Sequence, residues 1–182
     1  GDGNVSGIVG KEGLNRVMSH TVKNKIRHKF NYKKQTLSDY GRIFSPGEIG
    51  KYSGKINNIC NSIMKSTGVV LIYSQYIDGG IIPIALALEE LGFTRSSGMK
   101  NLFDTPPTVP IDSMTLKPKG DGATDGFSPA KYVMITGDKS ISPDNVADLK
   151  AATNLDNVNG EKVKVVLISL AGAEGLDFKF NR

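Results

Sequence analysis

Residues 163–169 constrain the fold most, because they are a nearly unbroken run of apolar, mostly β-branched side chains. Such a run is typical of a strand that is buried on both faces, as in a parallel sheet covered by helices. Gly172 and Gly175 follow closely. We expect them to form a tight loop in which the backbone can approach a ligand. Because open α/β sheets bind ligands where strands end, this loop is the first candidate for a functional site.

Two more apolar runs, residues 69–73 and 132–136, predict further buried strands. Apolar residues at spacings of three and four predict a helix over 51–65, and a second helix is predicted over 81–91. Ser142 is expected to cap a short third helix. Strands that alternate with helices indicate an α/β fold with a mainly parallel sheet.

The other segments are less regular. Residues 14–29 suggest a weak amphipathic helix, and residues 30–50 read as a loop. Residues 94–130 carry several prolines and glycines and are too long for an ordinary connection, so we interpret them as an insertion or a mobile loop. The predicted organisation is therefore a basic, partly irregular extension over 1–50 followed by the α/β domain over 51–182.

The chain has 182 residues and a net charge of +5, and one basic cluster stands out. It holds Lys23, Lys25, Arg27 and Lys29 with interleaved aromatic residues and no acidic residue. Such a cluster can bind a phosphate backbone and stack bases. It can equally be a solvated, partly mobile segment. No apolar run is long enough to span a membrane, and the single cysteine excludes an internal disulfide, so we expect a cytosolic or nuclear environment.

Small polar residues follow three of the predicted strands. Ser74 and Gln75 end the first, Thr136 and Gly137 the second, and Ser169 the third. In a parallel sheet these ends lie on one edge, where hydroxyl and backbone N–H groups can bind phosphate oxygens. The sequence therefore predicts a phosphate-contacting edge.

The sequence contains no complete catalytic set and no metal site. A phosphate loop is absent, and so is an Asp-Glu pair at the end of a strand. His20 and His28 lack a carboxylate or cysteine at metal-ligand spacing. Cys60 lies on the apolar face of a predicted helix and is expected to pack there. Glu174 and Asp177 have no positioned partner, which argues against hydrolysis by these carboxylates.

Several segments resemble superfamily 2 helicases and Swi/Snf-type translocases. Residues 69–74 look like motif IV, and the Ser-Gly-Lys within residues 52–56 looks like the segment that precedes it. Residues 135–138 resemble the strand-end motif between IV and V. Residues 169–177, Ser-Leu-Ala-Gly-Ala-Glu-Gly-Leu-Asp, are similar to motif V and form the most specific match. Residues 72–80 further resemble helicases and transcription-linked ATPases of large nucleocytoplasmic DNA viruses.

The resemblance implies a three-layer α/β/α, RecA-like C-terminal helicase domain that stops before motif VI. The full-length protein would bind ATP and Mg²⁺ together with an N-terminal RecA-like lobe that this sequence lacks. The fragment alone would hold no cofactor and would be inactive. Implied partners are DNA or RNA, the missing lobe and viral transcription machinery, with no membrane. The implied location is the virion or the viral factory in the host cytoplasm.

The resemblance also implies site residues. Those on the nucleic-acid backbone would be Ser74, Gln75, Thr136, Gly137, Ser169, Ala171 and Gly172. Gly175 and Asp177 would face the ATP cleft. Two alternatives stay open: a non-catalytic nucleic-acid-binding or scaffold domain with this fold, and an unrelated nucleotide-binding α/β enzyme that uses the loop over 172–177.

Overall fold

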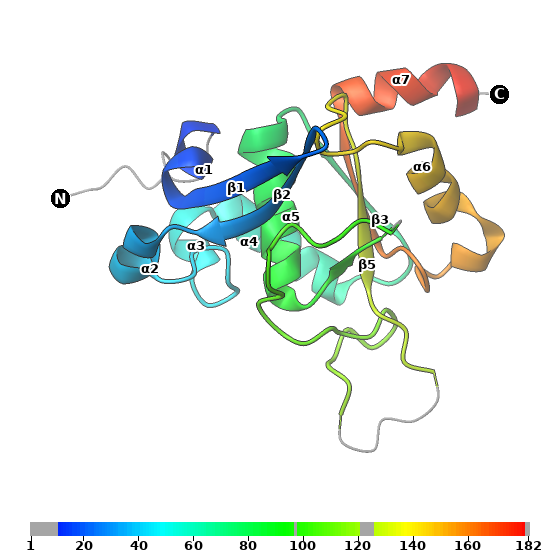
Figure 1. The fold of residues 1–182 in the computed structure, drawn as a ribbon. Coiled ribbons are helices and arrows are strands. Elements are labelled where there is room, and N and C mark those ends of the chain that lie inside the picture. Colours follow the sequence, from blue (N-terminus) through cyan, green and yellow to red (C-terminus); the bar gives the residue numbers. More distant parts are fainter. Residues whose placement is uncertain (1–10, 97, 121–125, 181–182) are drawn as a thin grey trace.

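The computed structural model describes residues 11–96, 98–120 and 126–180. A parallel sheet in the order β3-β6-β5-β4 lies at its centre (Figure 1). Its strands are β3 (Val70–Ser74), β4 (Thr94–Arg95), β5 (Lys131–Ile135) and β6 (Val165–Ser169). The parallel α/β fold expected from the sequence is thus confirmed.

Helices cover the sheet on both faces because the side chains of its strands alternate in direction. Val165 and Leu167 of β6 pack into a core with α4 (Gly54–Lys65) and α5 (Ile82–Leu91). Val166 faces the opposite way, into a second core. That core contains residues of α6 (Asn145–Thr153) and α7 (Leu170–Phe180). The result is three layers, α/β/α, with β6 between the two cores.

Strand β3 is an edge strand and is only half-buried. Val70 and Ile72 pack against the larger core, while Leu71 is 65% exposed and Tyr73 54% exposed. The prediction that residues 69–73 are buried on both faces is therefore wrong. The reason is that no described helix covers the second face of this strand, although its first face is packed as predicted.

The N-terminal segment folds differently from the prediction. After α1 (Lys11–Val17), strands β1 (Met18–Lys23) and β2 (Ile26–Tyr32) form an antiparallel hairpin, so the helix predicted over 14–29 is wrong. Asn24 and Lys25 have φ of 52° and 65°, the left-handed conformation that tight hairpin turns require. The loop predicted over 30–50 instead contains α2 (Lys34–Tyr40) and α3 (Ile49–Tyr52).

The described residues of this segment share the core of the sheet. Phe30 and Tyr32 of β2 are buried in the same hydrophobic core as residues of α5 and as Val165 and Leu167 of β6. Glu90 of α5 accepts hydrogen bonds from the Tyr32 hydroxyl, at 3.1 Å, and from Arg42 Nε, at 2.8 Å. The boundary predicted at residue 50 stays a prediction, but packing crosses it.

The connections around α5 and α6 carry further short elements. A π-helical turn, η2 (Ile77–Ile81), joins β3 to α5. Helix α6 is capped by Asp144, whose carboxylate accepts from Ala147 N at 3.1 Å, rather than by Ser142. A single 3₁₀ turn, η3 (Leu155–Asn157), follows α6. Residues 94–130 are mostly irregular where described, with isolated bridges between residues 111 and 118 and between 112 and 129.

A buried carboxylate on α5 holds the start of that irregular segment. Glu89 is 1% exposed and accepts hydrogen bonds from Leu102 N, at 2.7 Å, and Phe103 N, at 3.0 Å. The Tyr132 hydroxyl of β5 donates to the same carboxylate. Burial raises the pKa of Glu89 to about 7, although these donors oppose the shift.

This pKa predicts a pH-dependent stability. The pKa of Glu89 in the folded chain, about 7, lies above the ordinary value of 4.5, so folding takes up a proton between these two pH values. The free energy of unfolding of the wild type, relative to Glu89→Gln, should fall by up to about 3 kcal/mol as the pH rises through that window. Urea unfolding at several pH values measures the difference. Glu174→Gln, at an exposed position on α7, is the matched control, and parallel curves for wild type and Glu89→Gln would contradict the prediction.

Candidate functional site

The carboxyl ends of β3, β6 and β5 lie side by side at one edge of the sheet. Ser74 pairs with Ser169 in register, and Ile135, which precedes Thr136, pairs with Ile168. The three polar strand ends that the sequence predicted to meet are therefore adjacent.

All three of these hydroxyl groups make hydrogen bonds within the protein. Ser74 Oγ donates to Tyr76 O at 3.1 Å, and the other two hydroxyls are buried. Ser169 Oγ accepts from Gly172 N at 3.1 Å, and Thr136 Oγ1 lies 2.7 Å from Ser142 Oγ and accepts from Asp138 N at 3.1 Å. Thr136 and Ser169 are both 2% exposed. They shape the turns that leave β5 and β6, and their predicted contact with nucleic acid stays a prediction.

The exposed residues of the edge are different ones. Gln75, Gly137 and Ala171 are exposed, and Ser74 is half-buried. Gly172 is buried. Of the strand-end residues expected to contact the nucleic-acid backbone, a ligand can therefore reach Gln75, Gly137 and Ala171 fully from solvent and Ser74 in part.

The loop expected over residues 172–177 is wrong, because α7 begins directly after β6. The glycines there serve close packing. A Cβ on Gly172 would lie 2.2 Å from the Ile135 carbonyl oxygen, and a Cβ on Gly137 would lie 2.6 Å from the Ala171 Cβ. The first turn of α7 therefore packs directly on the end of β5, and the two glycines make this approach possible.

The two residues expected at the ATP cleft both belong to α7. Gly175 is exposed, and a Cβ there would meet nothing within 4 Å. Asp177 lies in the same helix, but its side chain falls outside the described residues. Both assignments stay predictions.

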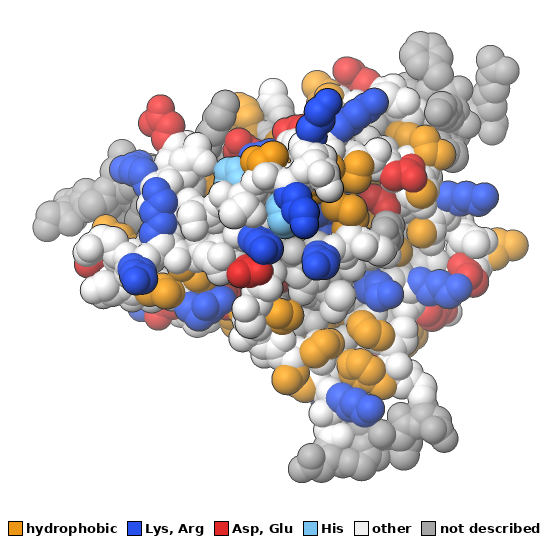
Figure 2. Space-filling view, viewed as in Figure 1, with side chains coloured by type: hydrophobic (Ala, Val, Ile, Leu, Met, Phe, Trp, Pro, Cys, Tyr) orange, Lys and Arg blue, Asp and Glu red, His pale blue; other side chains and the backbone are white. Residues whose placement is uncertain are grey.

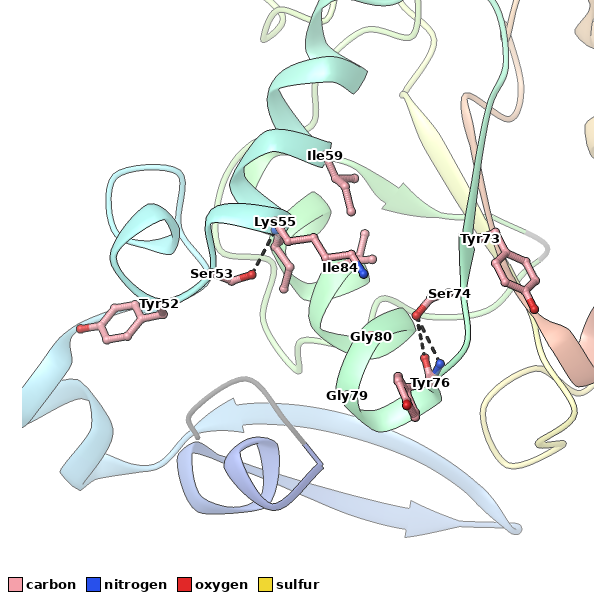
Figure 3. Close-up of a pocket in the computed structure, with 11 residues that line it drawn as sticks. Tyr52, Ser53, Lys55, Ile59, Tyr73, Ser74, Tyr76, Gly79, Gly80 and Ile84 are labelled. Carbon is pink, nitrogen blue, oxygen red and sulfur yellow. Dashed lines mark hydrogen bonds between the residues drawn. The ribbon is translucent and has the colours of Figure 1, made fainter. Parts of the chain in front are cut away.

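A pocket of about 320 Å³ opens beside Ser74, between the start of α4, the end of β3 and η2 (Figure 3). We call it the edge pocket. Lys55 extends from α4 toward Ile84 of α5 (Figure 3). Ser74 Oγ accepts from Tyr76 N at 3.3 Å, and a Cβ on Gly80 would lie 2.1 Å from this oxygen. The glycine thus lets η2 close against the end of β3.

The edge pocket combines groups that suit a nucleotide. It is lined by the Lys55 ammonium group, the Ser74 hydroxyl and Tyr76. Tyr52 and Tyr73 also border it, but their rings point away from Lys55 and Ser74 (Figure 3), and the Tyr52 ring packs edge-on against Tyr40. An ammonium group and a hydroxyl can bind phosphate oxygens, and an exposed ring can stack on a base. Tyr76 is 65% exposed. Neither these tyrosines nor Lys55 was selected from the sequence, although the Tyr-Ser-Gln-Tyr run at the end of β3 was a usable signal.

Arg27 fixes the hairpin over the same edge. Its guanidinium pairs with Asp78 of η2 at 3.0 Å and with Asp138 after β5 at 3.2 Å, and its backbone N–H donates to Ser140 O at 2.8 Å. Burial opposes the charge of Asp138, but hydrogen bonds from Ser140 and Arg27 outweigh it and lower its pKa.

The four basic residues selected from the sequence therefore divide into two groups. Arg27 is occupied by two carboxylates, whereas Lys23, Lys25 and Lys29 are exposed on the hairpin. Their contact with nucleic acid stays a prediction.

The other residues considered from the sequence, His20 and Cys60, pack against neighbouring side chains. His20 stacks on Phe30 with ring centroids 5.0 Å apart, and burial, with Arg27 nearby, lowers its pKa. Cys60 is buried, as expected, and burial raises its pKa to about 11.

Among residues 11–96, 98–120 and 126–180, no group of three or more His, Cys, Asp or Glu side chains could hold a metal ion. In the same ranges, every helix is too short or too polar to cross a bilayer.

The chain is similar to viral proteins named as termination factor NPH-I homologues. It is 32% identical over 139 residues to the homologue of African swine fever virus isolate Tick/South Africa/Pretoriuskop Pr4/1996. It is equally identical, over the same length, to that of isolate Warthog/Namibia/Wart80/1980. Each alignment covers 71% of this chain but 20% of the relative, so the chain spans about a fifth of these proteins. No family model matches the chain.

These relatives agree with the resemblance found in residues 72–80, which pointed to transcription-linked proteins of DNA viruses. The similarity to viral proteins named as termination factor homologues confirms that part of the resemblance. The assignment to a C-terminal helicase lobe stays a prediction.

The packing of α7 on β5 gives a direct test. Gly172→Ala places a methyl group against backbone atoms and should lower the free energy of unfolding by about 1–3 kcal/mol or more. Gly175→Ala, three residues later at an exposed helical position, should raise it by up to about 1 kcal/mol. Urea unfolding compares the two variants, and equal effects would show that the close approach is not what requires Gly172.

Proposed function

We propose that this chain is the C-terminal RecA-like lobe of a viral ATP-dependent helicase or translocase that acts on nucleic acid during transcription. The similarity to termination factor NPH-I homologues carries the proposal. The fold supports it, because a three-layer α/β/α domain with a parallel sheet presents its ligand-binding edge where strands end.

The nucleic acid would cross the edge of the sheet. Lys55 and Ser74 of the edge pocket would hold backbone oxygens, and the exposed ring of Tyr76 would stack on a base. The exposed backbone at Gly137 and Ala171 would add contacts to phosphate or sugar. Since such contacts read no base edges, binding should be nearly independent of sequence and should weaken steeply with salt.

ATP would bind on the side of α7, between this lobe and the N-terminal lobe. Gly175 and Asp177 would face that cleft, and the Mg²⁺ that accompanies ATP would be held mainly by the other lobe. Because α7 starts directly after Ser169 and packs on β5 through Gly172, a movement at the nucleotide would reach the sheet edge through one rigid connection. Cleft closure and opening would then step the two lobes along the nucleic acid.

The test is an ATPase assay of the full-length protein that contains this chain. Single- and double-stranded RNA and DNA are compared side by side, and we expect at least one of them to stimulate hydrolysis about tenfold or more. Asp177→Ala should remove most of the stimulated rate, whereas Glu174→Ala, an exposed position on the same helix, should keep it.

Two outcomes would contradict the proposal. ATP turnover that no nucleic acid changes would exclude a nucleic-acid motor. Tight nucleic-acid binding without any ATP hydrolysis would favour the alternative of a non-catalytic binding or scaffold domain.

A further inference from the structure

A second pocket, of about 380 Å³, lies between the hairpin and residues 98–101. We call it the basic pocket. Its lining includes Lys23, Arg27, His28, Lys29, Arg95 and Lys100, and none of its lining residues is acidic. Figure 2 shows Lys, Arg and His side chains gathered over the hairpin on the face turned to the viewer.

Three lysines give this pocket its uncompensated charge. Arg27 is paired with Asp78 and Asp138, and buried Arg95 donates to the Ile141 carbonyl oxygen. Lys23, Lys29 and Lys100 are exposed, and within the described part of the chain no carboxylate pairs with their ammonium groups. An anion in the pocket would therefore be attracted by lysines that have no carboxylate partner in that part of the chain.

One residue that lines the pocket also has a buried polar atom without a partner. His28 lines the pocket, and its Nε2 is buried without a hydrogen-bond partner in the described part of the chain. The pocket therefore contains, besides the lysines, a histidine whose ring is not fully hydrogen-bonded within the described part of the chain.

The lining favours phosphate over a base. Its apolar side chains are Ile26 and Met99, and it contains no Phe, Tyr or Trp ring on which a base could stack. The edge pocket, in contrast, has the exposed ring of Tyr76. An ion pair connects the walls of the two pockets. Arg27 of the basic pocket pairs with Asp78, and Asp78 is the sequence neighbour of Gly79 in the edge pocket. One strand could therefore place a base in the edge pocket and a phosphate in the basic pocket.

We propose that the basic pocket is a phosphate-binding site. The phosphate belongs to the backbone of the nucleic acid that crosses the edge pocket, and this assignment of the ligand rests on the proposed function. The site joins the hairpin to the irregular segment after β4, which are far apart in the sequence. It grips the backbone without reading sequence and so adds a second contact along the path of the strand.

The experiment compares two double variants of this chain that lose equal charge. Lys23→Gln with Lys100→Gln removes two ammonium groups of the basic pocket, and Lys65→Gln with Lys150→Gln removes two exposed ones on α4 and α6. Fluorescence anisotropy measures the affinity for 12-nucleotide oligo-dT and oligo-rU at several salt concentrations. Calorimetry with inorganic pyrophosphate measures binding of a free phosphate compound, and thermal unfolding checks that all variants are folded.

We expect the pocket variant to lose about tenfold or more in oligonucleotide affinity, and the control at most about threefold. The slope of log K against log salt should become shallower by about 0.7 for each phosphate that the variant no longer neutralises. If the wild type binds oligonucleotides and both variants lose the same affinity, the pocket proposal is overturned while the proposed function stands.

The pyrophosphate arm separates the remaining outcomes. If the wild type binds pyrophosphate but no oligonucleotide, and only the pocket variant loses pyrophosphate, the pocket is a phosphate site for a free compound and the proposed nucleic-acid binding fails. If the wild type binds neither probe, the pocket proposal is overturned together with that binding.

Discussion

The structure depends on the pairing of β6 with a parallel strand on each side. Because β6 bonds to both β3 and β5, its alternating side chains, Val165 and Leu167 against Val166, supply both cores. The same pairing brings three strand ends to one edge and delivers Ser169 to the point where α7 starts. The candidate site is thus a consequence of how the core is built. The strands end at one edge of the sheet, and α7 can pack against the end of β5 there because Gly172 has no side chain.

The second organising interaction is the ion pairing of Arg27. Its guanidinium is largely buried, with 14% of the side chain exposed, and two carboxylates from separate connections offset the cost of burying it. This contact fastens the hairpin to the sheet edge. It thereby places exposed lysines next to the edge pocket. Arg27, which was selected from the sequence for nucleic-acid binding, thus has a structural role, and its predicted contact with nucleic acid stays a prediction.

Local patterns predicted the sheet but not the surfaces built on it. Residues 163–169 and 132–136 were predictable because a strand buried on both faces needs an apolar run. The hairpin was missed because apolar residues in 14–26 happen to match helical spacing, while the turn rests on the left-handed conformations of Asn24 and Lys25. The glycine at position 172 led to the wrong prediction of a loop. It is required instead for close packing against Ile135, and that contact exists only in the folded chain. The basic pocket joins residues 23–29 to 98–101, a contact that no local pattern carries.

The central claim is that nucleic acid lies across the hairpin and the edge of the sheet, over both pockets. Lysine acetylation of this chain, read by mass spectrometry with and without a single-stranded oligonucleotide, tests it residue by residue. The account predicts protection of Lys23, Lys29, Lys55 and Lys100, with Lys65 and Lys150 unchanged. Equal protection of all six lysines, or protection of Lys65 and Lys150 alone, would contradict it.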